Sequence, residues 1–205
     1  RSATLAIATK ERAASEEYLN ELLDQQRRAR PAAEEAVEAE LSSVLAREGM
    51  GSRLGLLFPP VDIKFERPPA VIVTSPRDRI QLLEVVLLDP DLKGLERDRI
   101  EKKVLREHNL SALVDNLAGL ATYPTLVSDL DTLRGALQTA AHEWLHAYWV
   151  FRPLGRYYWR SAQMSTLNET AADLAGREIG DMTFALMGGD LTASARRYMS
   201  GEERD

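Results

Sequence analysis

The strongest constraint on the fold is a stripe of apolar residues with helical spacing between residues 128 and 152. Its members recur every three or four positions for more than five helical turns: Leu130, Leu133, Leu137, Ala141, Leu145 and either Tyr148 or Trp149. Ser128 and Asp131 resemble a capping box at its start, and Pro153 and Gly155 follow its end. The pattern predicts one long helix that buries a single face.

The remaining segments predict an α+β fold. Residues 61–66 alternate apolar and polar side chains and residues 70–74 are β-branched, which indicates two strands. Residues 80–88 predict a buried strand, and residues 92–108 predict a helix. Residues 117–127 predict a strand that Pro124 would place at a sheet edge. From residue 128 onward the pattern is helical, so the order is helices, a small sheet and helices.

The N-terminal part is expected to be helical. Residues 9–46 are rich in Ala, Glu, Leu and Arg, with apolar residues at helical spacing. Pro31 suits the first turn of a second helix, while Gly49 and Gly51 suit its end. We expect either a helical hairpin or one long helix, and we divide the chain into an N-terminal helical segment, residues 1–50, and a main domain, residues 51–205.

Composition limits the chemistry that the chain can perform. Its 205 residues are 44% hydrophobic, which is enough for a substantial core. The chain contains no cysteine, which excludes disulfides, thiolate zinc sites and thiol nucleophiles. A net charge of −6 argues against general nucleic-acid binding, which depends on neutralising phosphates.

Two of the three histidines lie on the predicted helix. His142 and His146 are four residues apart and therefore share one helix face. Such a pair can bind one zinc ion, and Glu143, about 100° around the helix, can reach a water molecule without being a ligand. No histidine follows His146, so we expect the third ligand that zinc needs to be a carboxylate from another helix. A surface histidine pair with Glu143 in an ion pair is the simpler alternative.

The pattern His142-Glu143-x-x-His146 resembles the zincin signature. The metzincin branch does not fit, because Trp149 and Arg152 stand where that pattern has its glycine and third histidine. The zinc ligand set is instead expected to resemble that of the gluzincins, the branch of zinc peptidases that includes thermolysin-like enzymes.

A second motif carries the gluzincin resemblance. Asn168-Glu169, followed by Asp173, resembles the Asn-Glu pair that opens a helix in that branch and the Asp four residues later. The resemblance covers about residues 140–180. It implies Glu169 as the third zinc ligand, with Asn168 and Asp173 in the outer shell and Asp173 as the acceptor for the second N–H of a ligand histidine. A capping box formed by Thr166 and Glu169 is an alternative explanation.

The resemblance implies hydrolysis of a peptide or protein substrate by a zinc metallopeptidase that holds one zinc ion in a zincin-like fold, with a small mixed sheet, an active-site helix and a helical C-terminal part. Glu143 is expected to act as the general base. Tyr158, favoured over Tyr157, is the candidate donor to the oxyanion. The strand within residues 117–127 is the candidate edge that binds an extended peptide.

Other functions stay open on the sequence alone. They are hydrolysis of a non-peptide bond, a zinc-binding scaffold without turnover, and a helical protein-interaction module built on residues 9–46. No apolar run approaches the roughly 18 residues that span a bilayer. Because the chain begins at Arg1 without a signal peptide, we expect a processed product or an excised segment. A membrane tether outside it, and an extracytoplasmic location of the domain, fit that expectation.

Overall fold

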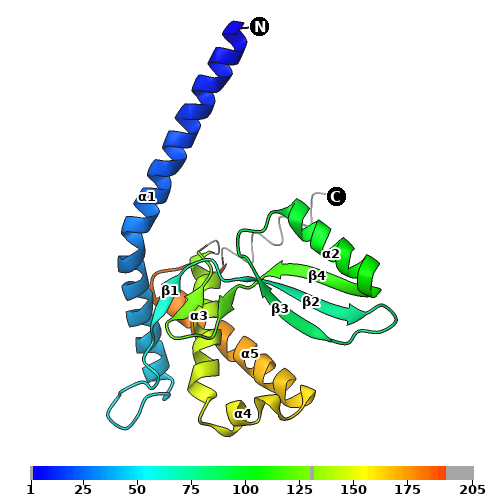
Figure 1. The fold of residues 1–205 in the computed structure, drawn as a ribbon. Helices are drawn as coiled ribbons and strands as arrows, with labels where there is room; N and C mark the ends of the chain where they lie inside the picture. The colour runs from blue at the N-terminus through cyan, green and yellow to red at the C-terminus, as the bar shows by residue number, and fades with distance from the viewer. Residues whose placement is uncertain (1, 130–131, 193–205) are drawn as a thin grey trace. The chain divides into compact units, whose positions relative to one another are not determined.

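The computed structural model describes residues 2–129 and 132–192, with side chains from residue 15 onward, and it has the expected mixed α+β composition (Figure 1). The elements follow in the order α1 Ser2–Arg47, β1 Ile63–Phe65, β2 Ala70–Pro76, β3 Glu84–Leu88, α2 Gly94–His108, β4 Leu110–Asn116, β5 Gly119–Leu120, β6 Thr125–Val127, α3 Leu133–Trp149, α4 Pro153–Arg156, the 3-10 helix η1 Tyr158–Arg160, and α5 Ala162–Leu186. Two compact units divide the chain, residues 1–37 and residues 38–205. Every strand and every candidate site residue belongs to the second unit.

Helix α1 is continuous through Pro31, so the long helix, rather than the hairpin, is the form that the structure adopts. Helix α1 ends at Arg47, close to the end that Gly49 indicated in the sequence. Gly49 has a φ of 75°, its N–H donates to the Ala46 carbonyl, and the Met50 N–H donates to the Leu45 carbonyl. These two bonds form a Schellman motif, which satisfies carbonyl groups at the end of the helix. None of the described helices combines the length and apolar character that a membrane span requires.

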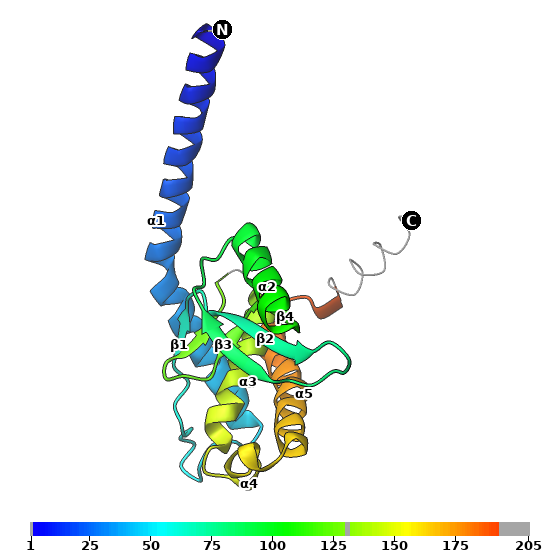
Figure 2. The same cartoon turned by 45° about the vertical axis from the view of Figure 1, so that its right-hand side comes forward.

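The strands form two three-stranded sheets instead of one. β3, β2 and β4 make an antiparallel sheet in that order. Helix α2 covers one face of it (Figures 1 and 2), where Ile100 and Val104 pack against Ala70, Ile72 and Val114. The second sheet has the order β1-β6-β5, with β1 parallel and β5 antiparallel to β6.

Several strand predictions need correction. Residues 117–127 form two short strands, β5 and β6, and Pro124 lies in the turn between them instead of at a sheet edge. β3 is not buried, because it is an edge strand whose Val85 and Leu87 are 51% and 55% exposed on the face opposite α2. β4 was not predicted at all. The strands within residues 61–66 and 70–74, and the helix at 92–108, are confirmed.

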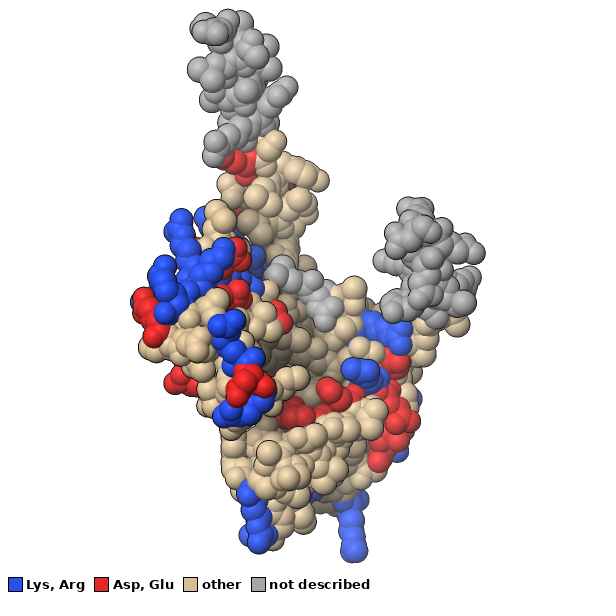
Figure 3. Space-filling model, turned by 90° about the vertical axis from the view of Figure 1, so that its right-hand side faces the viewer, with Lys and Arg blue, Asp and Glu red and all other residues tan. Residues whose placement is uncertain are grey.

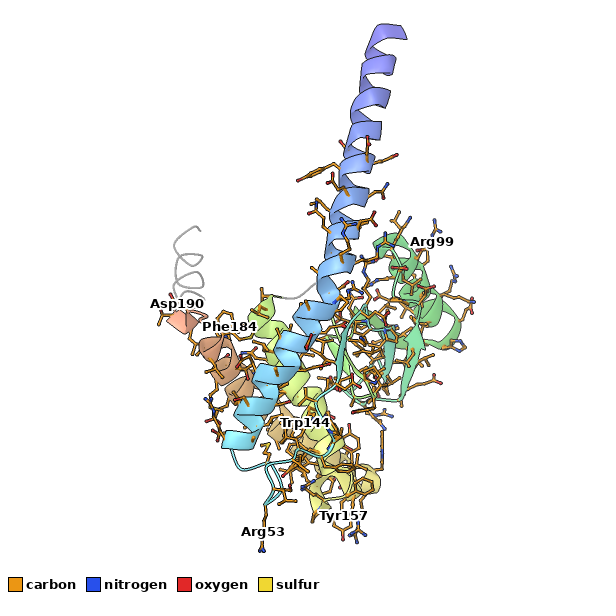
Figure 4. The ribbon with its side chains drawn as sticks, turned by 90° about the vertical axis from the view of Figure 1, so that its left-hand side faces the viewer. Arg53, Arg99, Trp144, Tyr157, Phe184 and Asp190 are labelled. Atoms are coloured by element: carbon orange, nitrogen blue, oxygen red, sulfur yellow. The ribbon has the colours of Figure 1, made fainter. Side chains whose placement is uncertain are left out.

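Helix α3 carries the central part of the predicted buried stripe, with Leu137, Ala141 and Leu145 fully buried, whereas Leu133 at its first position is 45% exposed. Its start was predicted wrongly, because Thr132 is the N-cap and its hydroxyl accepts a hydrogen bond from the Gly135 N–H. Leu130 and Asp131, which belonged to the predicted helix start, lie outside the described residues. Trp144 lies in the interior, where its indole N–H donates to the Pro59 carbonyl at 3.0 Å (Figure 4).

Helices α3 and α5 pack closely and antiparallel, because two glycines of α5 face the backbone of α3. A Cβ atom added to Gly176 would lie 3.0 Å from the backbone of His142, and one added to Gly180 would lie 2.5 Å from the Cα of Gln138. At the far end of this contact Arg134 forms two 2.7 Å hydrogen bonds to Asp181, which also accepts one from Gln138. This packing determines the distance between the α3 and α5 side chains of the candidate site.

Candidate metal centre

The two motif histidines face each other on α3. His142 and His146 are one helical turn apart, and their Nε2 atoms lie 3.0 Å from each other. Both side chains are mostly buried, at 18% and 17% exposure. Two nitrogen lone pairs at this distance need a proton or a cation between them, so the pair can bind a metal ion.

Helix α5 brings Glu169 to the same point. Its Oε2 lies 3.6 Å from the Nε2 of His142 and 3.5 Å from the Nε2 of His146. The alternative explanation of Glu169, a capping box with Thr166, is wrong. Helix α5 begins at Ala162 with Ser161 as its N-cap, so Glu169 lies beyond the first turn. The Thr166 hydroxyl instead donates to the Ala162 carbonyl.

The three donor atoms form a nearly equilateral triangle with sides of 3.0, 3.5 and 3.6 Å. Tetrahedral ligands at zinc distances of about 2.0–2.1 Å are separated by about 3.3 Å. The donor set therefore fits one zinc-sized cation with a fourth position open. A carboxylate oxygen of Glu143 also lies within 4.8 Å of both imidazoles. The shorter Glu169 distances make that residue the better third ligand and leave Glu143 for another role.

Asp173 orients one of the histidines. Its Oδ1 lies 3.1 Å from the Nδ1 of His142. A hydrogen bond from Nδ1–H fixes the tautomer in which Nε2 presents its lone pair to the other donors. Burial, together with the neighbouring His146, lowers the pKa of His142 against the opposing effect of Asp173 and Glu169. His142 is consequently neutral at physiological pH, as a metal ligand must be.

Glu143 lies in a more enclosed position than the other carboxylates. Burial, with a smaller contribution from the charge of Glu169, raises its pKa from 4.5 to about 7. Strand β5 passes directly over it, since a Cβ atom added to Gly119 would lie 2.8 Å from the Glu143 Cγ and 2.5 Å from the Thr139 Cγ2. A carboxyl group with this pKa can accept and release a proton near neutral pH.

Tyr158, and not Tyr157, lies at the site. The Tyr158 hydroxyl donates a 2.6 Å hydrogen bond to the Glu169 Oε1, and its ring stands 6.4 Å from that of His146. Burial and this bond raise its pKa to about 12, so the phenol stays protonated. Tyr157 is 44% exposed at the end of the helical part (Figure 4). Tyr158, which sequence reasoning favoured, therefore lies at the site, and Tyr157 lies outside it.

Asn168 occupies a structural position next to Glu169. It is 1% exposed, and its amide donates to the Leu154 carbonyl, which ties α5 to α4. In the described contacts it touches no imidazole of the site. Its effect on the metal centre is therefore to hold the helix that carries Glu169.

Sequence reasoning missed the glycines that allow α5 and β5 to approach α3 closely. Gly176 and Gly180 follow Ala172 at four-residue intervals on α5, a spacing that is readable from the sequence and typical of close helix packing. Gly119 carries no comparable signal, because its contact with Glu143 arises from the path of β5 across α3.

A small cavity adjoins the centre. It measures about 240 Å³ and is lined by Ala118, Gln138, Thr139, His142, Glu143, Asp173 and Arg177. Figure 3 shows acidic side chains gathered in a hollow of the surface, with basic side chains at its border. The Glu169 and Asp173 side chains are 44% and 57% exposed, so the candidate centre can be reached from solvent.

Comparisons with protein-family models, with curated proteins and with solved structures found no significant match to this chain. The geometry of the site and the two sequence motifs are consequently the basis for its function.

Proposed function

We propose that this protein is a zinc-dependent peptidase of the gluzincin type. His142, His146 and Glu169 hold one zinc ion, and Asp173 supports His142. The observation that carries the proposal is the donor triangle, whose sides of 3.0–3.6 Å match a tetrahedral zinc site. These donors come from two helices and converge at one point. A histidine pair without a metal role would not need a carboxylate from a second helix at that point.

The chemistry divides between the metal and the chain's own residues. Bound zinc supplies a Lewis acid that lowers the pKa of a water molecule. Glu143, whose pKa in the metal-free protein is about 7, would accept a proton from the attacking water and pass it to the departing amine. Tyr158 keeps its proton, which it donates to the Glu169 Oε1 in this structure. To stabilise the developing oxyanion, the hydroxyl would have to exchange that hydrogen bond for one to the substrate.

The edge of the β1-β6-β5 sheet supports a peptide as the substrate. β5 has no strand on its outer side among the described residues. The Ala118 carbonyl accepts from Ser128 N–H, and in an antiparallel pair neighbouring residues face opposite edges. The N–H and C=O of Gly119 therefore face the free edge directly above Glu143. An extended peptide paired there would pass over the metal centre.

Metal analysis and one variant test the proposal. Protein purified without a histidine tag should contain about one zinc per chain, and protein with near-zero zinc after incubation with the metal would refute it. Glu143→Gln should retain zinc but cleave a peptide library about a hundredfold or more slowly, measured by mass spectrometry. Full cleavage by this variant would remove Glu143 from the mechanism. Zinc without any cleavage by the parent would favour a zinc-binding scaffold.

A second function, protein interaction through α1, has one observation in its favour. Tyr18, Leu19, Leu22 and Leu23 share one side of the helix and are 41–64% exposed. Such a stripe suits packing against another helix. Light scattering tests it by comparing the molar mass in solution of the full chain with that of a Leu19→Glu, Leu22→Glu variant. A monomeric parent that captures no helical partner would exclude this function and leave the metal centre unaffected.

A further inference from the structure

The cavity beside the metal centre contains one cationic side chain. Arg177 is the only Lys or Arg among the seven residues that line it. It stands on α5 two turns beyond Glu169, whereas Tyr158 contacts Glu169 from η1. The two residues thus lie on opposite sides of Glu169 in the sequence.

Two other polar side chains of the cavity already have polar partners, and a third packs through its methyl group. Asp173 contacts His142, Gln138 donates to Asp181, and Thr139 packs beneath Gly119. Within residues 15–129 and 132–192, no hydrogen bond or ion pair involves the Arg177 guanidinium, and the side chain is exposed. An unpaired guanidinium at the wall of a solvent-open cavity is free to bind an anion from solution.

We propose that Arg177 binds a carboxylate of the substrate and thereby selects peptides that carry a negative charge near the cleaved bond. This inference rests on the proposed peptidase function. A guanidinium forms two parallel hydrogen bonds to a carboxylate, which gives both attraction and orientation. At about 240 Å³ the cavity is smaller than the roughly 300–1,000 Å³ of pockets for drug-sized molecules, so it suits one or two side chains.

The position of Arg177 limits where that carboxylate lies in the substrate. Arg177 lies eight positions after Glu169, which corresponds to about 12 Å along the helix axis. An extended peptide covers that length in about four residues. The long arginine side chain shortens the gap, so the bound carboxylate belongs to one of the first three or so residues on one side of the cleaved bond. It is either an acidic side chain or the free carboxyl terminus.

Binding measurements separate this inference from the peptidase function. The probes are fluorescent octapeptides bound to zinc-loaded Glu143→Gln protein. One set is amidated and carries Glu or Gln at each position in turn, and a second set compares a free with an amidated carboxyl terminus. Arg177→Gln, Arg177→Lys and the control Arg99→Gln are made in the same background. Arg99 lies on α2 and is exposed (Figure 4).

We expect Arg177→Gln to weaken binding of the carboxylate peptides about tenfold and to leave their neutral partners unchanged. Arg177→Lys should restore part of the loss, and Arg99→Gln should behave as the parent. The more strongly affected set identifies the source of the carboxylate. Equal binding of Glu and Gln peptides and of free and amidated termini, or an equal loss for charged and neutral peptides, would overturn the assignment.

Cleavage by protein with the natural Glu143 is measured in parallel. Carboxylate-dependent binding that needs Arg177, without cleavage of any peptide, would retain the site and reject the peptidase. Cleavage of the carboxylate peptides that does not change in Arg177→Gln would retain the peptidase and reject the site.

Discussion

At the scale of single residues, Glu143 differs from the other carboxylates of the centre in its degree of enclosure. Glu169 and Asp173 have side chains that are 44% and 57% exposed, whereas Glu143 lies beneath β5 and has its pKa raised to about 7. The raised pKa means that folding favours the protonated form of Glu143 when no metal is bound. Ionised Glu143 consequently lowers the stability of the folded chain, and a neutral side chain at this position would not.

This difference predicts a pH-dependent effect of Glu143→Gln in metal-free protein. Between the ordinary pKa of 4.5 and about 7, the folded parent binds more protons than the unfolded chain, so its stability falls as the pH rises. The variant lacks this loss. Its free energy of unfolding relative to the parent should rise by about 3 kcal/mol between pH 4 and pH 8, as measured by urea denaturation with chelator present. A difference that does not vary with pH would contradict the burial of Glu143.

The sequence predicts the site residues that are neighbours on a single helix. His142, Glu143 and His146 must be neighbours if residues 133–149 are helical, as they are. Glu169 and Asp173 depended on resemblance, because only tertiary packing brings α5 against α3. Arg177 and Gly119 could not be predicted, since neither has a motif and each reaches the site through the packing of its element.

At the scale of the elements, the contact between α3 and α5 determines the geometry of the centre. Because Gly180 meets the backbone of Gln138, an added methyl group has no flexible neighbour to displace. Gly180→Ala should therefore separate the helices and lower the free energy of unfolding by about 1–3 kcal/mol, with weaker zinc binding. Gly94→Ala is the control, since nothing lies within 4 Å of its added Cβ. Equal stability of the two variants, measured in urea, would refute the close contact.

The pair of Arg134 and Asp181 ties the same two helices together and gives a second prediction. Hydrogen bonds from Arg134 lower the pKa of Asp181 below its ordinary value of 3.8, so the pair stabilises the fold above that pH. The contribution is lost as the pH falls through the lowered pKa. Asp181→Asn should cost about 1 kcal/mol at pH 7, and acid denaturation curves should show parent and variant converging as the pH falls below 3.8. A constant difference down to pH 2 would exclude the ionic contribution.

The sheets show why element predictions failed where they did. Residues 80–88 were predicted to form a buried strand because they are largely apolar and precede Asp89-Pro90. Burial of Val85 and Leu87 would require a neighbour on the face opposite α2, and a sequence pattern does not specify one. In strand β4 the alternation of Leu110, Ala112 and Val114 is interrupted by Leu113. The strand forms because β2 provides a partner for it along its whole length. Local pattern thus predicted the helices better than the strands, whose order depends on long-range pairing.

At the scale of the whole molecule, the metal is expected to act as a cross-link between α3 and α5. Zinc at about a thousand times its dissociation constant should stabilise the folded chain by about 4 kcal/mol. Adding a chelator should therefore lower the melting temperature of the parent, measured by calorimetry, and should leave that of His146→Ala unchanged. A chelator effect of the same size in both proteins would show that the metal binds elsewhere.

The antiparallel contact of α3 and α5 also has a consequence for protein engineering. Five side chains of the centre, His142, Glu143, His146, Glu169 and Asp173, come from only two helices whose spacing is set by two glycines. A designer could transplant this set to any helical bundle that contains one antiparallel pair with Gly at the positions of Gly176 and Gly180. The recipient would need neither sheet to assemble the proposed metal ligands, and it would need an equivalent of β5 only for the proposed binding of a peptide above them.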